Sequence, residues 1–162
     1  MQLAIISDTH MPRGSRRLPE ACVARLAAAD AILHCGDFAR VEVIDAIAAI
    51  GPPLHAIHGN VDDDVVRTRL PERLEVELGG KRFGLVHDPG SRRHRLERLR
   101  GWFPEADAVL FGHTHLPEHD EHEGFQIFNP GSPTERRRAP AHTMGEATIL
   151  QGRLTFDLIA VG

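Results

Sequence analysis

Seven side chains of the kinds that bind metal ions follow five short apolar segments of this chain. In chain order they are Asp8, His10, Asp37, Asn60, His87, His113 and His115. The apolar segments, which we interpret as strands, are 3–6, 31–33, 55–57, 84–86 and 108–111. Side chains carried by separate strand ends can converge only where those strands lie side by side. We therefore expect one sheet with a metal centre at the carboxyl edge of its strands.

The composition of this set indicates its chemistry. Two carboxylates, four imidazoles and one amide oxygen exceed the needs of one tetrahedral zinc site and suit two ions that share a carboxylate. Mixed oxygen and nitrogen ligands favour two divalent transition-metal ions, manganese first and then Fe, Co, Ni or Zn, over Ca or Mg. Two such ions, two carboxylates and a bridging hydroxide carry a net charge of roughly +1, which attracts phosphoryl oxygens. The expected reaction is phosphoester hydrolysis with that hydroxide as the nucleophile.

Periodicity predicts the elements that position these residues. Helical spacing alternates with strands through the first two thirds of the chain, and the period changes to two from Arg73 onward. Gly79-Gly80 then marks the turn of a hairpin, and Gln151-Gly152 marks another. Ser91 is expected to cap the third helix. The expected helices are 18–29, 41–50 and 91–102, and the expected later strands lie in 73–87, 124–128 and 147–161.

Bulk properties indicate one soluble domain spanning residues 1–162. A chain of 162 residues with 41% hydrophobic and 26% charged content can bury a core of its own. The net charge of −4 disfavours nucleic acid as the main partner, although arginine-rich clusters at 92–95 and 136–138 leave that option open. We interpret both clusters as solvated basic surface.

The cysteine content and the N-terminal segment suggest a location. Cys22 and Cys35 are the only cysteines, which suits a reducing cytoplasm, and we expect Cys35 to be a core residue rather than a ligand. The first apolar run stops at Ser7-Asp8, too early for a signal peptide. No stretch approaches the roughly 18 apolar residues that span a membrane. We expect a cytoplasmic protein, with a homo-oligomer left open.

Six short motifs stand in a fixed order along residues 3–132. They are Asp8-x-His10, Gly36-Asp37, Gly59-Asn60-Val61-Asp62, His87, Gly112-His113-x-His115 and Asn129-Pro130-Gly131-Ser132. With these motifs the chain resembles the calcineurin-like metallophosphoesterases, and most of all their small bacterial and archaeal phosphodiesterase branch.

The resemblance implies a fold and a set of roles. The fold would be an α/β, four-layer αββα sandwich of two mixed β-sheets flanked by helices. One metal would be held by Asp8, His10 and His115, and the other by Asn60, His87 and His113, with Asp37 bridging. Among these residues, Asp37, Asn60 and His113 are also expected to take part in catalysis. The substrate would be a small phosphoester, with a nucleotide as one candidate.

The chain departs from the pattern of its larger relatives at two positions. Val61 stands where many of them have a histidine that assists catalysis, which would cost roughly 10²–10⁴ in rate for poor leaving groups. This change favours phosphodiesters with good leaving groups over monoesters. Asp88-Pro89-Gly90 also replaces the usual glycine and histidine after His87, so substrate contacts there would differ.

An alternative function is possible for this fold, and several other polar residues lie near the predicted ligands in the sequence. A non-catalytic protein-interaction scaffold of the same fold is the alternative function, although such a scaffold would be expected to have lost ligands. We expect Asp62 to form a turn or support a ligand, and His34 to be a core residue. His58 could reach a phosphate, and the stretch 118–123, with His119 and His122, is expected to be a solvated loop.

Overall fold

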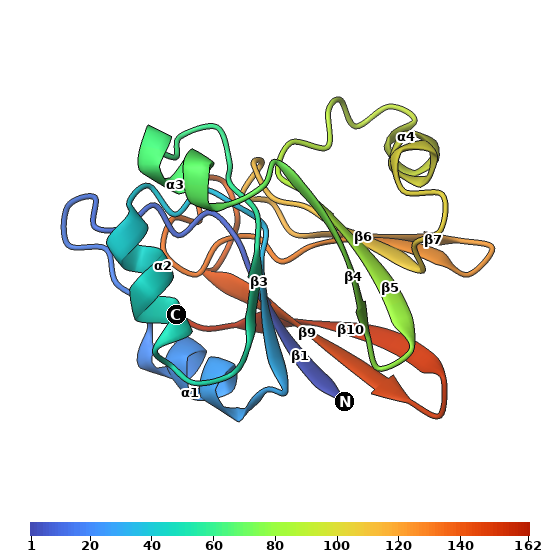
Figure 1. Cartoon of the computed structure of the whole chain (residues 1–162), viewed down its shortest axis with the longest axis horizontal. Coiled ribbons are helices and arrows are strands. Elements are labelled where there is room, and N and C mark those ends of the chain that lie inside the picture. The colour runs from blue at the N-terminus through green and yellow to red at the C-terminus, as the bar shows by residue number, and fades with distance from the viewer.

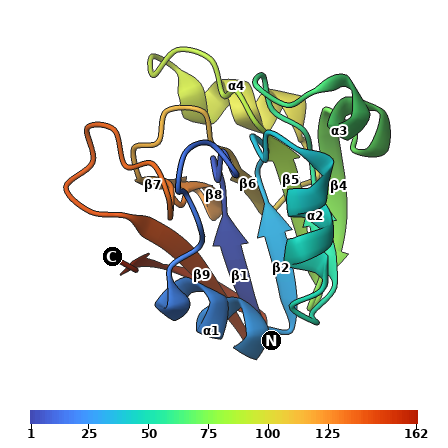
Figure 2. The same ribbon diagram turned by 90° about the vertical axis from the view of Figure 1, so that its left-hand side faces the viewer.

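The computed structural model describes residues 1–162 as two β-sheets packed face to face, with helices on the outer faces (Figures 1 and 2). The helices are α1 (Glu20–Ala28), α2 (Val41–Ala48), α3 (Asp64–Arg69) and α4 (Arg95–Trp102). The strands are β1 (Gln2–Ile6), β2 (Ala31–His34), β3 (Leu54–Ala56), β4 (Arg73–Leu78), β5 (Lys81–Val86), β6 (Ala108–Leu110), β7 (Glu118–His122), β8 (Phe125–Asn129), β9 (Thr143–Leu150) and β10 (Arg153–Ala160). The four-layer αββα prediction is confirmed.

Both sheets are mixed, as predicted, and each has five strands. The first sheet has the order β10-β9-β1-β2-β3, in which β1, β2 and β3 are parallel and β9 and β10 are antiparallel additions. The second has the order β4-β5-β6-β8-β7, with β5, β6 and β8 parallel. Its outer strands β4 and β7 pair antiparallel with β5 and β8. The predicted hairpin after Arg73 is the β4–β5 pair.

Three apolar clusters hold the layers together. The largest lies between the sheets and includes Leu33 of the first sheet with Phe83 and Phe128 of the second. A second cluster packs α1, α2 and α3 on the first sheet, and a third packs α4 on the second sheet through Leu99 and Phe103. Each fully buried side chain of this size contributes about 1.5–3 kcal/mol of transfer free energy. None of the helices is long and apolar enough to cross a membrane.

The prediction of one ligand-bearing sheet is wrong. The segments before Asp8, Asp37 and Asn60 belong to the first sheet, whereas those before His87 and His113 belong to the second. The carboxyl ends of both groups of strands meet at the same end of the sandwich (Figure 1). These strands are short and mostly buried, so their sequences carry no signal for which sheet they join.

Two elements were missed and one boundary was misplaced. Helix α3 begins after Asp63, whose side chain accepts a hydrogen bond from the Val66 N–H. The expected loop at 118–123 forms the edge strand β7, whose charged side chains remain exposed, as suits a sheet edge. Ser91 does not cap α4, which begins after His94.

Candidate metal centre

The loops after β1, β2, β3, β5 and β6 bring all seven predicted ligands to one end of the sandwich. Five of the seven have a left-handed backbone, with φ between 45° and 70°: Asp8, His10, Asp37, His113 and His115. For residues other than glycine this conformation costs on the order of 1–2 kcal/mol each. Strain of this kind collects at functional sites, because the rest of the structure must hold it in place.

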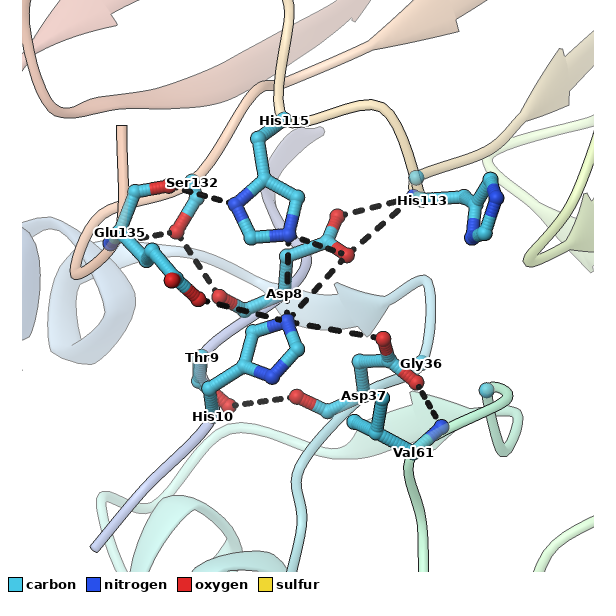
Figure 3. A network of polar contacts seen from close by, with 12 residues as sticks. Asp8, Thr9, His10, Gly36, Asp37, Val61, His113, His115, Ser132 and Glu135 are labelled. Atoms are coloured by element: carbon cyan, nitrogen blue, oxygen red, sulfur yellow. Dashed lines mark hydrogen bonds and ion pairs between the residues drawn. The ribbon is translucent and has the colours of Figure 1, made fainter. Parts of the chain in front are cut away.

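Four of the side chains form the first half of the centre (Figure 3). His10 Nε2 lies 3.1 Å from His115 Nε2 and 3.8 Å from Asp8 Oδ1. His115 Nε2 lies 3.3 Å from the same Asp8 oxygen. His10 Nε2 is also 3.5 Å from Oδ2 of Asp37, which links this half to the next.

The second half of the centre consists of His87, Asn60 and His113, and Asp37 joins it to the first half. His87 Nε2 lies 3.2 Å from Asp37 Oδ2 and 3.1 Å from Asn60 Oδ1. Asn60 Oδ1 in turn lies 2.9 Å from His113 Nδ1. The same Asp37 oxygen therefore faces both His10 and His87, which is the position expected of a bridging ligand.

The donor set fits two metal ions. Ligands bound at about 2.0–2.2 Å from one ion lie about 3.0–3.5 Å apart when they are adjacent. Most of the separations around Asp37 fall in this range, and the atoms that face one another are carboxylate, amide and imidazole acceptors. Two groups of three close ligand atoms share Asp8: one with His10 and His115, and one with Asp37 and His87. The arrangement is consistent with a dinuclear site.

Electrostatics keep both carboxylates ionised. Burial of Asp8 opposes its ionisation, but contact with His10 and the charges of His87 and His115 outweigh it and lower the pKa of this carboxyl. The backbone N–H of His113 also donates to both Asp8 oxygens, at 3.2 and 3.0 Å. For Asp37, contact with His87 outweighs burial and lowers the pKa to about 2.

His87 carries the proton that a metal ion must displace. Burial disfavours its charged form, but Asp37 and Asp8 outweigh burial and raise the pKa of His87 to about 9. The pKa of His115 is lowered instead, because the effect of burial exceeds that of the Asp8 charge, which raises it. At neutral pH the metal-free centre thus contains an imidazolium beside two carboxylates.

Backbone carbonyls orient two of the imidazoles. His87 Nδ1 lies 2.7 Å from the Cys35 carbonyl oxygen, and His115 Nδ1 lies 2.5 Å from that of Glu135. In each ring Nδ1–H donates to the carbonyl, so Nε2 is directed at the neighbouring ligands. This is how metal-bound histidines are commonly held. Cys35 itself is a buried core residue whose thiol has a raised pKa because of burial.

Glycines allow the loops to approach the two carboxylates. A Cβ added at Gly59 would lie 2.0 Å from Asp37 Oδ1. A Cβ at Gly112 would lie 2.0 Å from Ser7 Oγ and 2.7 Å from Asp8 Oδ2. Any side chain at either position would displace a candidate ligand.

Asp62 ties three loops together beneath the centre. Its buried carboxylate accepts hydrogen bonds from the backbone N–H groups of Asp37 (3.0 Å), Ala39 (2.6 Å) and Gly59 (2.7 Å). It therefore supports the turn that carries Asp37, as expected from the sequence, and does not itself join the cluster of ligand atoms.

Glu135 lies at the centre but was missed. Its Oε2 is 3.8 Å from His10 Nε2, and its carbonyl oxygen orients His115 (Figure 3). A signal was present, because Glu135 comes three residues after the motif that ends at Ser132.

The remaining histidines have other surroundings. His34 is buried, stacks on Phe38 with ring centroids 3.6 Å apart, and has a pKa lowered by burial to about 3, so it is a neutral core residue as expected. His58 lines a cavity of about 450 Å³ beside the metal centre, together with Asn60 and His87. His119 packs edge-on against Phe128 in the second sheet.

The arginine clusters are not uniformly solvated surface. Arg95 is 7% exposed and forms an ion pair with Glu118 of β7, and one of its guanidinium nitrogens donates to the Gly90 carbonyl at 2.9 Å. Expecting only basic surface at 92–95 was therefore wrong for Arg95. Arg136 donates to the Ala139 carbonyl within its own loop, at 2.9 Å.

Comparison with known proteins agrees with this geometry. Residues 1–152 match the family model of the calcineurin-like phosphoesterase superfamily domain. A probable metallophosphoesterase from Methanocaldococcus jannaschii is 33% identical over 141 residues, which are 85% of this chain and 70% of the relative.

Two solved structures share the fold. An archaeal phosphodiesterase superposes with a TM-score of 0.76 at 21% identity, covering 98% of this chain and 100% of its own. Vps29 from Entamoeba histolytica, solved in complex with Zn²⁺, has a TM-score of 0.77 at 22% identity and full coverage of both chains. From its motifs, its sheets and these matches, the chain belongs to the calcineurin-like phosphoesterase superfamily.

Proposed function

We propose that this single domain, residues 1–162, is a di-metal phosphodiesterase acting on a small phosphoester. The observation that carries the proposal is the position of Asp37 Oδ2, 3.5 Å from His10 Nε2 and 3.2 Å from His87 Nε2, between two sets of ligands. Two divalent ions bound there would supply positive charge for the phosphoryl oxygens and an activated water as nucleophile. Manganese is our choice of metal, from the mixed oxygen and nitrogen ligands.

The chain's own residues would orient and bind in this reaction. Asp8, Asp37 and Asn60 supply the oxygen ligands, and His113 is the most open of the imidazoles, since it is only half-buried. We assign Asp37, Asn60 and His113 to catalysis because Asp37 lies between the two halves of the centre, and Asn60, which lines the neighbouring cavity, contacts both His87 and His113.

The cavity beside His87 would receive the ester group of the substrate. Its walls include His58, Arg67 and Arg73, which could contact a further phosphate or the polar face of a nucleotide. Arg67 is held in place by hydrogen bonds to the Asp62 and Asn60 carbonyls, at 2.9 and 2.8 Å. The same wall carries Glu72 and Asp88, so the two arginines supply local positive charge for an anionic substrate without making the whole cavity cationic.

Val61 supports the preference for diesters. No imidazole follows Asn60, so the leaving group would take its proton from water, a metal-bound water or another side chain. A good leaving group tolerates this arrangement better than an alkoxide does. Only two cysteines are present and both are free and buried, which fits the proposed cytoplasmic location.

Turnover of model substrates tests the proposal. Metal-free protein reconstituted with Mn²⁺ should hydrolyse bis(p-nitrophenyl) phosphate faster than p-nitrophenyl phosphate. Asp37→Ala should abolish turnover and weaken binding of both ions, whereas Asp63→Ala, which alters a nearby helix cap, should retain activity. Full activity in the Asp37 variant would refute the two-metal proposal.

The alternative is a non-catalytic protein-interaction scaffold. Its support is the likeness in fold to Vps29, a protein named for vacuolar protein sorting. That structure holds Zn²⁺, so metal binding alone cannot separate the two functions. The complete ligand set favours the enzyme, and turnover decides between them: metal-loaded protein that binds two ions but hydrolyses no phosphoester would favour the scaffold.

A further inference from the structure

We propose that Glu135 is an additional ligand of the ion held by Asp8, His10 and His115, an inference that rests on the two-metal site proposed above. Glu135 Oε2 lies 3.8 Å from His10 Nε2. This equals the separation between His10 Nε2 and Asp8 Oδ1. The carboxylate of Glu135 thus stands as near to His10 as Asp8 does, but it lies outside the mutually close ligand atoms of Asp8, His10 and His115, so its side chain would have to move toward them to share the ion.

The separation fits a shared ion. Two ligands bound at about 2.1 Å from one ion lie about 3.0 Å apart at a right angle and about 4.2 Å apart when opposite. In Figure 3 the Glu135 carboxylate approaches His10 from the side away from Asp37. Glu135 would therefore bind the first ion alone and would not bridge to the second.

Hydrogen bonds fix Glu135 to the strand end that carries Asp8. Ser132 Oγ accepts from the Glu135 N–H at 2.9 Å and donates to the Asp8 carbonyl at 2.8 Å. Thr134 Oγ1 donates to the Thr9 carbonyl at 2.7 Å. The turn containing Glu135 and the loop containing the first ligands are thus one connected unit, as a metal site requires.

One oxygen of Glu135 is engaged elsewhere. Glu135 Oε1 pairs with Arg16 at 2.9 Å, and both side chains are partly exposed. A purely structural role for Glu135 would be to hold the Arg16 loop through this ion pair. Such a role makes no use of Oε2, the oxygen nearest to His10. Variants of Glu135 and of Arg16 can therefore distinguish a role as a metal ligand from a role in the ion pair alone.

A third carboxylate would change the charge of the centre. Two divalent ions, Asp8, Asp37 and a bridging hydroxide carry a formal charge of roughly +1, which Glu135 reduces to roughly zero. The lower charge suits the single negative charge of a phosphodiester better than the double charge of a monoester. Glu135 would thus add to the diester preference argued from Val61.

Metal titration of three proteins tests the assignment. Mn²⁺ is titrated by calorimetry into metal-free wild type, Glu135→Gln and Arg16→Gln, after circular dichroism has shown that each is folded. Wild type should bind two ions. In Glu135→Gln, one of the two should bind about 10–100-fold more weakly. Arg16→Gln should bind both ions at least as tightly as wild type, because it leaves the carboxylate free.

Substitution with Co²⁺ tests the ligand role directly. The visible absorption of bound Co²⁺ depends on its ligands and does not depend on the ion pair between Glu135 and Arg16. The visible absorption of the Co²⁺ protein should change in Glu135→Gln and stay unchanged in Arg16→Gln. Equal weakening in the two variants, or unchanged affinity and spectrum in Glu135→Gln, would overturn the assignment. Wild type that binds fewer than two ions would overturn the two-metal function as well, so the two failures are distinguishable.

Discussion

Replacing Asp62 with alanine should be among the most destabilising single changes near the centre. The carboxylate accepts three backbone N–H groups, those of Asp37, Ala39 and Gly59, and no backbone carbonyl accepts from them. Each buried donor left without an acceptor costs about 1–3 kcal/mol. Because water entering the site would satisfy part of this loss, we expect the free energy of unfolding to fall by about 3–5 kcal/mol.

Urea denaturation followed by circular dichroism measures this change, with chelator present so that metal binding does not contribute. The matched control is Asp63→Ala, which removes one N-cap hydrogen bond to Val66 at 3.0 Å and should cost about 1 kcal/mol. The affinity for Mn²⁺ should also fall in the Asp62 variant, because the Asp37 N–H loses its acceptor and the turn that carries Asp37 is less well held. The affinity should be unchanged in the Asp63 variant. If the Asp62 variant is no less stable than the control, the account of the loop junction is wrong.

Four further predictions concern metal binding, stability and the loops. Because a metal must displace the proton of His87, whose pKa is about 9, the apparent affinity for Mn²⁺ should rise about tenfold per pH unit from roughly pH 7 to 9 and then level off; isothermal titration across this range checks it. In metal-free protein the raised pKa of His87 stabilises the fold fully below its unfolded value of 6.5, and this stability is lost as the pH rises through about 9, which thermal melts in chelator would detect. Gly112→Ala should weaken metal binding and lower the melting temperature, because its Cβ would collide with Ser7 and Asp8, whereas Gly101→Ala in α4, which meets nothing within 4 Å, should stabilise the protein by about 0.5–1 kcal/mol. Where free metal is held at 100 times its dissociation constant, removing it should cost about 2.7 kcal/mol of stability for each bound ion, visible as a lower melting temperature.

The ligands could be predicted because each is a polar residue that follows the end of a short apolar strand within a few residues. Asp37 and His113 also follow a glycine that lets the chain turn at the strand end. The resemblance then supplied the two sheets. Periodicity could not have done so, because a three-residue strand such as β6, buried throughout, fits equally well into either sheet.

The elements that were missed are those without an apolar pattern. Helix α3 has six residues and one buried side chain, Val66, which is too few to show a helical period. Strand β7 reads as charged loop because the edge of the sheet leaves four of its five residues exposed. Glu135 was missed for a different reason: it lies in an arginine-rich loop three residues after Ser132, and the Ser132 turn brings its carboxylate to the centre.

The centre lies where the two sheets meet, and this explains how it stays assembled without metal. Asp8 and Asp37 come from loops of the first sheet, and His87 comes from the second. Two anions brought this close would repel each other unless a cation stood between them. In the metal-free protein the His87 imidazolium is that cation, 3.2 Å from Asp37 and 4.0 Å from Asp8. Metal binding would therefore release the His87 proton and put the positive charge of the metal ions in its place at the same junction.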